Sequence, residues 1–350
     1  MSNKKLSVIV PNYNHAQYIR EALETILSQS FRPLEVIVVD NCSTDNSVEI
    51  IESIAKQDPI VRLLKNEHNK GMIYSFNRAL KCALGDYIYS GNSDDRVLPG
   101  FFEKSIKLLA QYPQAGLCHG RILYIDEEGK VLSESKPTLF TEYEGYVYPE
   151  QIFAELRANL GLGVVYGNTA IVKRSALIET GGYIAELDAF NDGFMNMTIA
   201  LKYGVCYIPE PLACWRRMEG GLSSILGRSV EKFVNVVSYA EQLMKSSKYS
   251  DLFPKDFVKE WKQIRLYELG KGLLDRGQSQ QKSFLKDLKY LRQNPTFIDR
   301  IFSWGLTLWM RIQLLIIKLY LICHVLFIWR LTAIKLRLIY KRFLQKVNWT

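Results

Sequence analysis

Short apolar segments alternate with amphipathic segments over about the first 90 residues, and this alternation limits the fold more than any other feature. Strands are predicted at residues 6–10, 34–39, 61–64 and 86–89, and the first of these is an apolar run of the kind typical of a buried parallel strand. Apolar residues at helical spacing predict helices between them, at residues 15–29, 46–56 and 71–84. Strands that alternate with helices of this length form a parallel sheet with helices on both faces. The sequence therefore predicts an α/β fold.

The rest of the chain has fewer strand patterns and ends in a long helical region. Further strands are predicted at residues 116–125, 169–172 and 205–208, with a hairpin-type turn at 126–129. Helices are predicted at residues 101–111 and 192–203, and the helical pattern continues from 230 to 294. Residues 133–165 are rich in Glu, Tyr, Pro and Gly, and we expect an irregular, flexible region there.

The positive charge of the chain lies in its C-terminal part. The formal net charge of the 350 residues is +9, and the part from Arg300 onward contains nine Lys and Arg but no Asp or Glu. Residues 1–299 are therefore formally neutral, and one large α/β domain with a helical extension is the expected organisation. No cysteine pair has CxxC spacing and no signal peptide is apparent at the N-terminus, which favours the reducing cytoplasm.

Residues 312–329 are almost wholly apolar but are interrupted by Lys318. Tryptophans lie where interfacial anchors are expected, and basic residues follow. This pattern favours an amphipathic helix on an anionic membrane surface, formed by residues 300–350. A buried core helix, a dimer helix and a spanning helix are the alternatives. The apolar content argues against nucleic acid as a partner.

Adjacent carboxylates, Asp94 and Asp95, follow the predicted strand at 86–89. Carboxylates at the C-terminal end of a strand lie where α/β sheets bind ligands. They are hard oxygen ligands, and Mg²⁺ is typically held by one or two of them together with substrate phosphates. The pattern predicts a site for a metal and a diphosphate, and a solvated helix cap is the alternative.

Polar loops follow two other predicted strands, at residues 11–14 and 40–45. Loops after successive parallel strands gather around one crevice, so we expect them beside Asp94 and Asp95. Neither a phosphate-binding P-loop nor a dinucleotide fingerprint is present. The run from Gly161 to Gly167 has the wrong spacing and no strand before it.

Over residues 5–225 these motifs, in this order, resemble glycosyltransferase family 2. The resemblance rests on residues 7–14 (Ser-Val-Ile-Val-Pro-Asn-Tyr-Asn), 29–31, 38–45, 77, 85–88, 92–95, 181–183, 191–192 and 215–217. It implies a GT-A (Rossmann-like) fold, which is a mostly parallel sheet flanked by helices, here with a C-terminal helical extension. It also implies a nucleotide-sugar donor, a divalent metal (Mn²⁺ or Mg²⁺) and inversion at the anomeric carbon.

The resemblance also implies roles for residues of the donor site. Pro11 and Tyr13 would border the base, and Asp40 would hold it, with Asn41 in place of a second acid. Asn77 belongs to the donor-binding set. Asp94 would contact ribose or metal, Asp95 would contact the metal, and Asn92 replaces a frequent first Asp of this signature.

Asp192 matches the family's catalytic acid. An inverting transfer needs a base that takes the proton of the acceptor hydroxyl, opposite the leaving diphosphate. The alternative for Asp192 is a helix-terminal capping residue, and Asp188 is a second candidate base. Asn191 stands where the family usually has Glu.

Arg216 and Arg217 are basic residues placed to reach a diphosphate, and a solvated basic turn is the alternative. Met218 stands where many relatives have a metal-binding His.

From these patterns we expect an inverting hexosyltransferase of surface polysaccharide synthesis. It would use a nucleotide-sugar donor, with UDP favoured, and a glycan acceptor that is lipid-linked. Residues 1–228 would form the catalytic domain (1–125 for the donor, 126–228 for the acceptor), 229–298 a helical extension and 299–350 the membrane-associating helix. The expected location is the inner face of the cell membrane. The alternatives are a non-catalytic nucleotide-sugar-binding homologue, a glycosidase with paired carboxylates, and a basic membrane-interaction protein.

Overall fold

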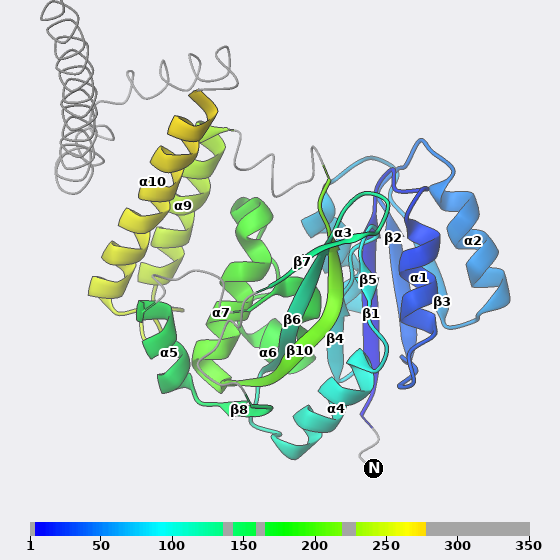
Figure 1. Ribbon diagram of the computed structural model, residues 1–350, viewed down its shortest axis with the longest axis horizontal. Coiled ribbons are helices and arrows are strands. Elements are labelled where there is room, and N and C mark those ends of the chain that lie inside the picture. The colour runs from blue at the N-terminus through cyan, green and yellow to red at the C-terminus, as the bar shows by residue number, and fades with distance from the viewer. Residues whose placement is uncertain (1–3, 136–142, 159–164, 219–228, 278–350) are drawn as a thin grey trace, which may run out of the picture. The chain divides into compact units, whose positions relative to one another are not determined.

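The computed structural model describes residues 4–135, 143–158, 165–218 and 229–277 (Figure 1). The chain divides into two compact units, residues 1–265 and residues 266–350. All the site residues discussed below lie in the first unit. The predicted membrane-associating segment, residues 299–350, lies outside the described residues.

A ten-stranded sheet forms the centre of the first unit. Its strands are β1 (Leu6–Asn12), β2 (Glu35–Asp40), β3 (Val61–Lys65), β4 (Tyr87–Ser90), β5 (Arg96–Val97), β6 (Leu117–Ile125), β7 (Val131–Glu134), β8 (Gly145–Val147), β9 (Ile171–Lys173) and β10 (Val205–Arg216). The strand order is β3-β2-β1-β4-β9-β6-β10-β5, with β7 beside β6 and β8 beside β10. Strands β3, β2, β1 and β4 are parallel, as are β6 and β10, whereas β9 runs antiparallel to both of its neighbours.

Helices cover both faces of this sheet (Figure 1). They are α1 (Ile19–Leu27), α2 (Ser47–Gln57), α3 (Met72–Cys82), α4 (Phe101–Gln111), α5 (Pro149–Ala158), α6 (Arg174–Glu179), α7 (Asn191–Tyr203), α9 (Val230–Lys245) and α10 (Lys255–Gly277), with 3-10 turns η1 (Gly167–Thr169) and η2 (Ala185–Phe190). The predicted mostly parallel α/β fold is confirmed. The predicted helical region begins as α9 and α10, and its part beyond residue 277 lies outside the described residues.

Two hydrophobic cores lie on opposite faces of the sheet, because successive side chains of a strand point in opposite directions. In β1, Val8 and Val10 pack with α1, α2 and α4, whereas Ile9 packs in the core that contains α3, α6 and α7. The second core also takes in residues of α9 and the start of α10, among them Val237 and Trp261. Packing of the first unit therefore continues past residue 228, where we expected the catalytic domain to end.

Two details differ from the sequence-based expectation. The stretch 133–165, expected to be irregular, contains strand β8 and helix α5. Helix α5 packs inward through Ile152 and Leu156, which are fully or almost fully buried. Strand β10 extends to Arg216, well beyond the predicted end at residue 208, because β-bulges near Pro211 allow pairing with β6 to continue. Every helix within the described ranges is too short or too polar to cross a bilayer.

His119 on β6 gives the fold a measurable pH dependence. The side chain is completely buried against Tyr207, and this loss of solvation lowers the pKa of His119 to about 3. In the unfolded chain a histidine binds its proton near pH 6.5, so stability should fall as the pH drops from 6.5 toward 3. At pH 5 this coupling costs about 2 kcal/mol. We expect His119→Leu to remove about that much of the stability difference between pH 7 and pH 5, measured by urea unfolding. Equal pH dependence in both proteins would contradict this prediction.

Candidate functional site

The carboxyl ends of β1, β2 and β4 meet at one edge of the sheet. Asn12 at the end of β1 lies beside Asp40 at the end of β2, and its side-chain amide donates to the Asp40 carboxylate over 2.9 Å. The N–H of Asn41 donates to the Asn12 carbonyl (2.8 Å), and that of Gly91, after β4, donates to the Ile9 carbonyl (2.9 Å). The polar loops after these strands are therefore neighbours, as the sequence predicted.

Asp40 and Asn41 are buried and hold these loops in shape. Besides Asn12, the carboxylate of Asp40 accepts hydrogen bonds from the N–H and hydroxyl of Ser43, at 2.9 and 2.6 Å. The amide of Asn41 bonds to the loop before α3, through the partners Asn66 (3.0 Å), Asn69 (2.6 Å) and the Lys70 N–H (2.9 Å). An amide both donates and accepts here, which a carboxylate cannot do. This explains why Asn is suited to the position of the family's second acid.

Three other predicted donor-site residues lie near this edge of the sheet: Tyr13, Pro11 and Asn77. Tyr13 follows β1 with 42% of its surface exposed, so its ring is free to stack against a planar ligand. Pro11 lines a small cavity described below. Asn77 on α3 donates to the Tyr183 carbonyl (2.8 Å) and thereby ties α3 to the Gly181-Gly182-Tyr183 loop.

Asp94 and Asp95 differ sharply in their surroundings. Both oxygens of Asp95 accept hydrogen bonds, one from the Arg216 N–H (2.8 Å) and one from the Asn92 amide (2.7 Å), and the residue is 4% exposed. Asp94 is only partly buried, and no other described residue donates a hydrogen bond to its carboxylate. The geometry favours Asp94 over Asp95 as the residue that contacts a ligand.

This acidic pair fits a divalent cation. Burial raises the pKa of Asp94, and burial together with the neighbouring charge of Asp94 raises the pKa of Asp95. A cation would stabilise the ionised form of both groups. In the described part of the chain no group of three or more acidic, His or Cys side chains could hold a metal alone. The residues therefore suit a metal that takes its remaining ligands from a bound diphosphate.

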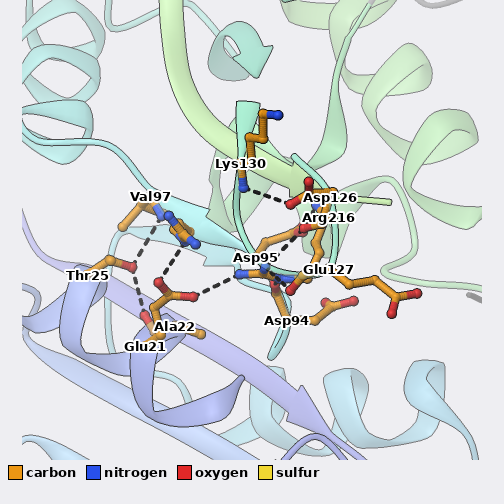
Figure 2. Close-up of polar contacts among 11 residues, drawn as sticks. Glu21, Ala22, Thr25, Asp94, Asp95, Val97, Asp126, Glu127, Lys130 and Arg216 are labelled. Carbon is orange, nitrogen blue, oxygen red and sulfur yellow. Dashed lines mark hydrogen bonds and ion pairs between the residues drawn. The ribbon is translucent and has the colours of Figure 1, made fainter. Parts of the chain in front are cut away.

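Arg216 holds the acidic loop in place through its hydrogen bonds (Figure 2). The residue is 3% exposed, and all three guanidinium nitrogens have protein partners. These partners are the carbonyls of Asp94 (2.8 Å), Asp126 (3.1 Å) and Glu127 (2.7 Å) and the carboxylate of Glu21 (2.8 Å). Its charge also lies over the Tyr18 ring at 4.6 Å. These contacts use four of the five guanidinium N–H donors, and together with the burial of the residue they favour a positioning role for Arg216 over the diphosphate contact that we expected from the sequence.

Arg217 remains available at the surface. It is exposed, and its guanidinium lies over the rings of Tyr124 (4.3 Å) and Trp215 (4.5 Å). Met218, at the position of a frequent metal-binding His, is half-buried, and its soft thioether does not suit Mn²⁺ or Mg²⁺. Of the two arginines, only Arg217 keeps the geometry for a solvent-side phosphate contact.

A cavity of about 60 Å³ brings together residues from distant parts of the chain. Its lining includes Pro11 near the end of β1, Asn92 beside the acidic pair, and Asp192 at the start of α7. Asp188 and Met72 also line it. The candidate base thus faces the same space as the donor-side loops, although 100 residues separate Asp192 from Asn92.

Asp192 is placed for proton transfer. Asp192 is an exposed residue, yet the protein packed beside its carboxyl group raises its pKa by desolvation, while the N–H of Gly193 (2.8 Å) partly opposes this shift. The carboxyl reaches solvent at the cavity and carries no ion pair to a described residue. A carboxylate with a raised pKa and access to a ligand has the properties of a general base.

Gly167 is a site residue that sequence reasoning missed. A Cβ atom at this position would lie 2.1 Å from Oδ2 of Asp192, so any larger residue would displace the Asp192 carboxylate. The available sequence signal was the glycine-rich run from Gly161 to Gly167, which was compared only with the dinucleotide-binding pattern.

Asn191 and Asp188 shape the approach to Asp192. The buried Asn191 amide accepts from the N–H of Ile184 (3.0 Å) and donates to the carbonyl of the same residue, which fixes the preceding loop to α7. Asp188 has φ 47° and ψ −131°, a strained conformation for a residue with a side chain. Strain of this kind persists where the surrounding structure enforces it, often beside functional sites.

Comparison with known protein sequences finds glycosyltransferases. The sequence model described as Glycosyl transferase family 2 matches residues 7–181, half of the chain. An uncharacterized glycosyltransferase of Methanocaldococcus jannaschii is 32% identical over 156 residues, which cover 43% of this chain and 54% of the relative. The matched part spans 54%, 32% and 29% of the length of the first three curated relatives.

Two solved structures share the fold. TarS of S. aureus (residues 1–349) has a TM-score of 0.58 at 18% identity, over 85% of this chain and 83% of that one. The mannosyltransferase PcManGT of Pyrobaculum calidifontis, in complex with GDP-Man and Mn²⁺, has a TM-score of 0.54 at 20% identity, with the same coverages of 85% and 83%. The fold is that of the GT-A glycosyltransferases, as the sequence predicted.

Proposed function

The chain belongs to glycosyl transferase family 2, and on that premise we propose that it is an inverting, metal-dependent glycosyltransferase. The donor is a nucleoside diphosphate sugar, with UDP as the nucleotide favoured from the sequence, and the acceptor is a hydroxyl group of a glycan. In this proposal residues 1–125 bind the donor and residues 126–228 form the acceptor side. The PcManGT complex with GDP-Man and Mn²⁺ supports a metal and a nucleotide sugar as the chemistry to test.

One observation carries the proposal: Asp192 lines the same cavity as Pro11 and Asn92. A base and a donor-binding loop must face one space for an acceptor hydroxyl to attack the donor sugar. The raised pKa of Asp192 and its access to solvent support its role as that base.

The reaction follows from these positions. The acceptor oxygen forms a bond to the anomeric carbon as the bond from that carbon to the diphosphate oxygen breaks, and Asp192 takes the acceptor proton. The nucleoside diphosphate leaves from the opposite face. Asp94 would hold the cation, with Asp95 beside it, and a bound Mn²⁺ or Mg²⁺ would neutralise the charge of the leaving diphosphate. Tyr13 would stack against the base, and Asp40 and Asn41 would shape the loops around it.

The lipid-linked acceptor and the attachment to the inner membrane face are part of the same proposal. They rest on the basic, apolar sequence of residues 299–350. A glycan that grows on a lipid would then be held close to the catalytic unit, which is the arrangement expected for surface polysaccharide assembly.

Calorimetric titration of the full chain with UDP and with GDP, each with and without Mn²⁺, tests the donor site. We expect one nucleotide to bind in a Mn²⁺-dependent manner, and Asp94→Asn to abolish the Mn²⁺-dependent part. The matched control is Asp86→Asn, because Asp86 precedes the same strand β4 at its opposite end, where it accepts a hydrogen bond from Lys5. Absence of binding to either nucleotide, or equal loss in both variants, would count against the proposed site.

A further inference from the structure

A second, larger cavity lies between α3 and the chain segment from α6 to η2. Its volume is about 890 Å³, within the range of small-molecule sites. Three exposed apolar side chains, Met72 (38%), Tyr74 (44%) and Ile178 (52%), contribute to its lining. We call this cavity the α3–α6 groove. Exposed apolar and aromatic surface within a groove of this size is typical of a ligand site rather than of ordinary protein surface.

The α3–α6 groove is positively charged. Lys70, Lys81 and Arg174 line it, and Asp188 is the single acidic residue of the lining. Neither Lys81 nor Arg174 forms an ion pair with any residue in the described ranges, and Nε of Arg174 is buried without a hydrogen-bond partner. Cations without acidic partners, one of them a guanidinium with an unused donor, suit an anionic ligand and above all phosphate.

The groove adjoins the proposed site of proton transfer. Met72 and Asp188 line both the groove and the cavity that contains Asp192. Asp188, in its strained conformation, lies at this junction. A ligand that occupies the groove can therefore extend one end toward Asp192.

We propose that the α3–α6 groove binds the acceptor and that this acceptor is a glycan bearing phosphate groups. The inference rests on the proposed transferase function, in which an acceptor hydroxyl must reach Asp192. Lys81 and Arg174 pair with acceptor phosphate, Tyr74 and Ile178 contact the apolar faces of acceptor sugars, and Met72 and Asp188 border the end that carries the attacking hydroxyl. The groove thereby selects anionic over neutral acceptors.

A binding experiment on the full chain tests the inference without catalysis. The probe is a fluorescently labelled glycerol phosphate oligomer, and its binding is followed by anisotropy. We expect Lys81→Gln with Arg174→Gln to weaken binding by about tenfold or more. The control pair Lys107→Gln with Lys232→Gln removes the same charge from exposed positions on α4 and α9 and should leave binding unchanged. Because Lys81 is exposed, Lys81→Glu alone provides a variant that does not disturb packing, and it too should weaken binding.

Three outcomes would overturn the inference: no binding of the oligomer, equal loss in the groove and control variants, or competition by neutral maltotriose as effective as that by the unlabelled oligomer. Nucleotide titration in the presence of Mn²⁺ separates this inference from the proposed function. If nucleotide binding is retained but the groove variants bind the oligomer normally, the acceptor assignment fails and the donor site stands. If the groove variants lose nucleotide binding to the same degree, the groove belongs to the donor and the inference is wrong.

Discussion

Replacing Asp192 with Asn is expected to lower the rate of sugar transfer by about 100- to 10,000-fold, the usual contribution of a general base. Asn keeps the size of the side chain and can still accept the hydrogen bond from Gly193, but it cannot take a proton. Nucleotide binding should change little, because the residues around the donor loops are untouched. Donor turnover with the natural or a surrogate acceptor, together with calorimetry, measures both quantities.

Two companion variants define what the Asp192 result means. Asp188→Asn tests the second candidate base, which lines the same cavity. If this variant loses more activity than Asp192→Asn, Asp188 is the base and the assignment to Asp192 is wrong. Asp251→Asn changes an exposed residue in another part of the unit and should be neutral. Full activity of Asp192→Asn would instead favour a nucleotide-sugar-binding protein that does not catalyse transfer.

The pH dependence of the rate gives an independent check. Desolvation raises the pKa of Asp192 above the ordinary carboxyl range, and a base works only when deprotonated. The rate should therefore fall on acidification at a higher pH than an ordinary aspartate, with a pKa of about 3.9, would produce. The residual activity of Asp192→Asn should lack this fall.

Local sequence was sufficient for much of the fold and for the donor loops. The apolar runs of β1 and β2 and the polar residues that follow them, such as Asn12 and Asp40, are encoded within a few positions of one another. Parallel pairing then brings the ends of these strands together, which a short-range pattern can predict. Strand β8 and helix α5 were missed because their segments carry a weak pattern and are stabilised by packing against distant elements.

Residues that depend on long-range contacts were harder to assign. Asn41 and Asn191 replace acids of the family pattern, and these replacements motivated the alternative of a non-catalytic homologue. In the structure each amide uses both its donor and its acceptor: Asn41 joins two loops, and Asn191 joins the preceding loop to α7. The effect of a side chain at Gly167 on the Asp192 carboxylate arises only once Asp192 lies against it. No pattern within either segment contains that information.

Arg216 illustrates the same limit, since its carboxylate partner Glu21 is 195 positions away. We expect Arg216→Met to destabilise the first unit by about 3 kcal/mol, chiefly because it leaves backbone carbonyls without their buried donor. The ion pair itself contributes less, since Glu21 is 44% exposed and also pairs with Arg96. The change leaves three backbone carbonyls and the carboxylate of Glu21 without this donor (Figure 2). It also removes the contact that holds the Asp94 carbonyl, so Mn²⁺-dependent nucleotide binding should weaken as well.

Arg217→Met is the matched control for Arg216, because it removes the same group from the next position of the chain. Arg217 is exposed and its guanidinium contacts only the rings of Tyr124 and Trp215 among the described residues, so its loss should cost about 1 kcal/mol or less. Urea unfolding of the two variants at neutral pH gives the comparison. Equal free energies of unfolding for the two variants would mean that the buried contacts of Arg216 do not stabilise the first unit. Normal nucleotide binding by a folded Arg216→Met protein would show that the acidic loop keeps its shape without this residue. A destabilised Arg216→Met protein with weakened Mn²⁺-dependent binding would establish that Arg216 holds the metal-binding loop in place through its contacts with α1 and the hairpin at 126–129.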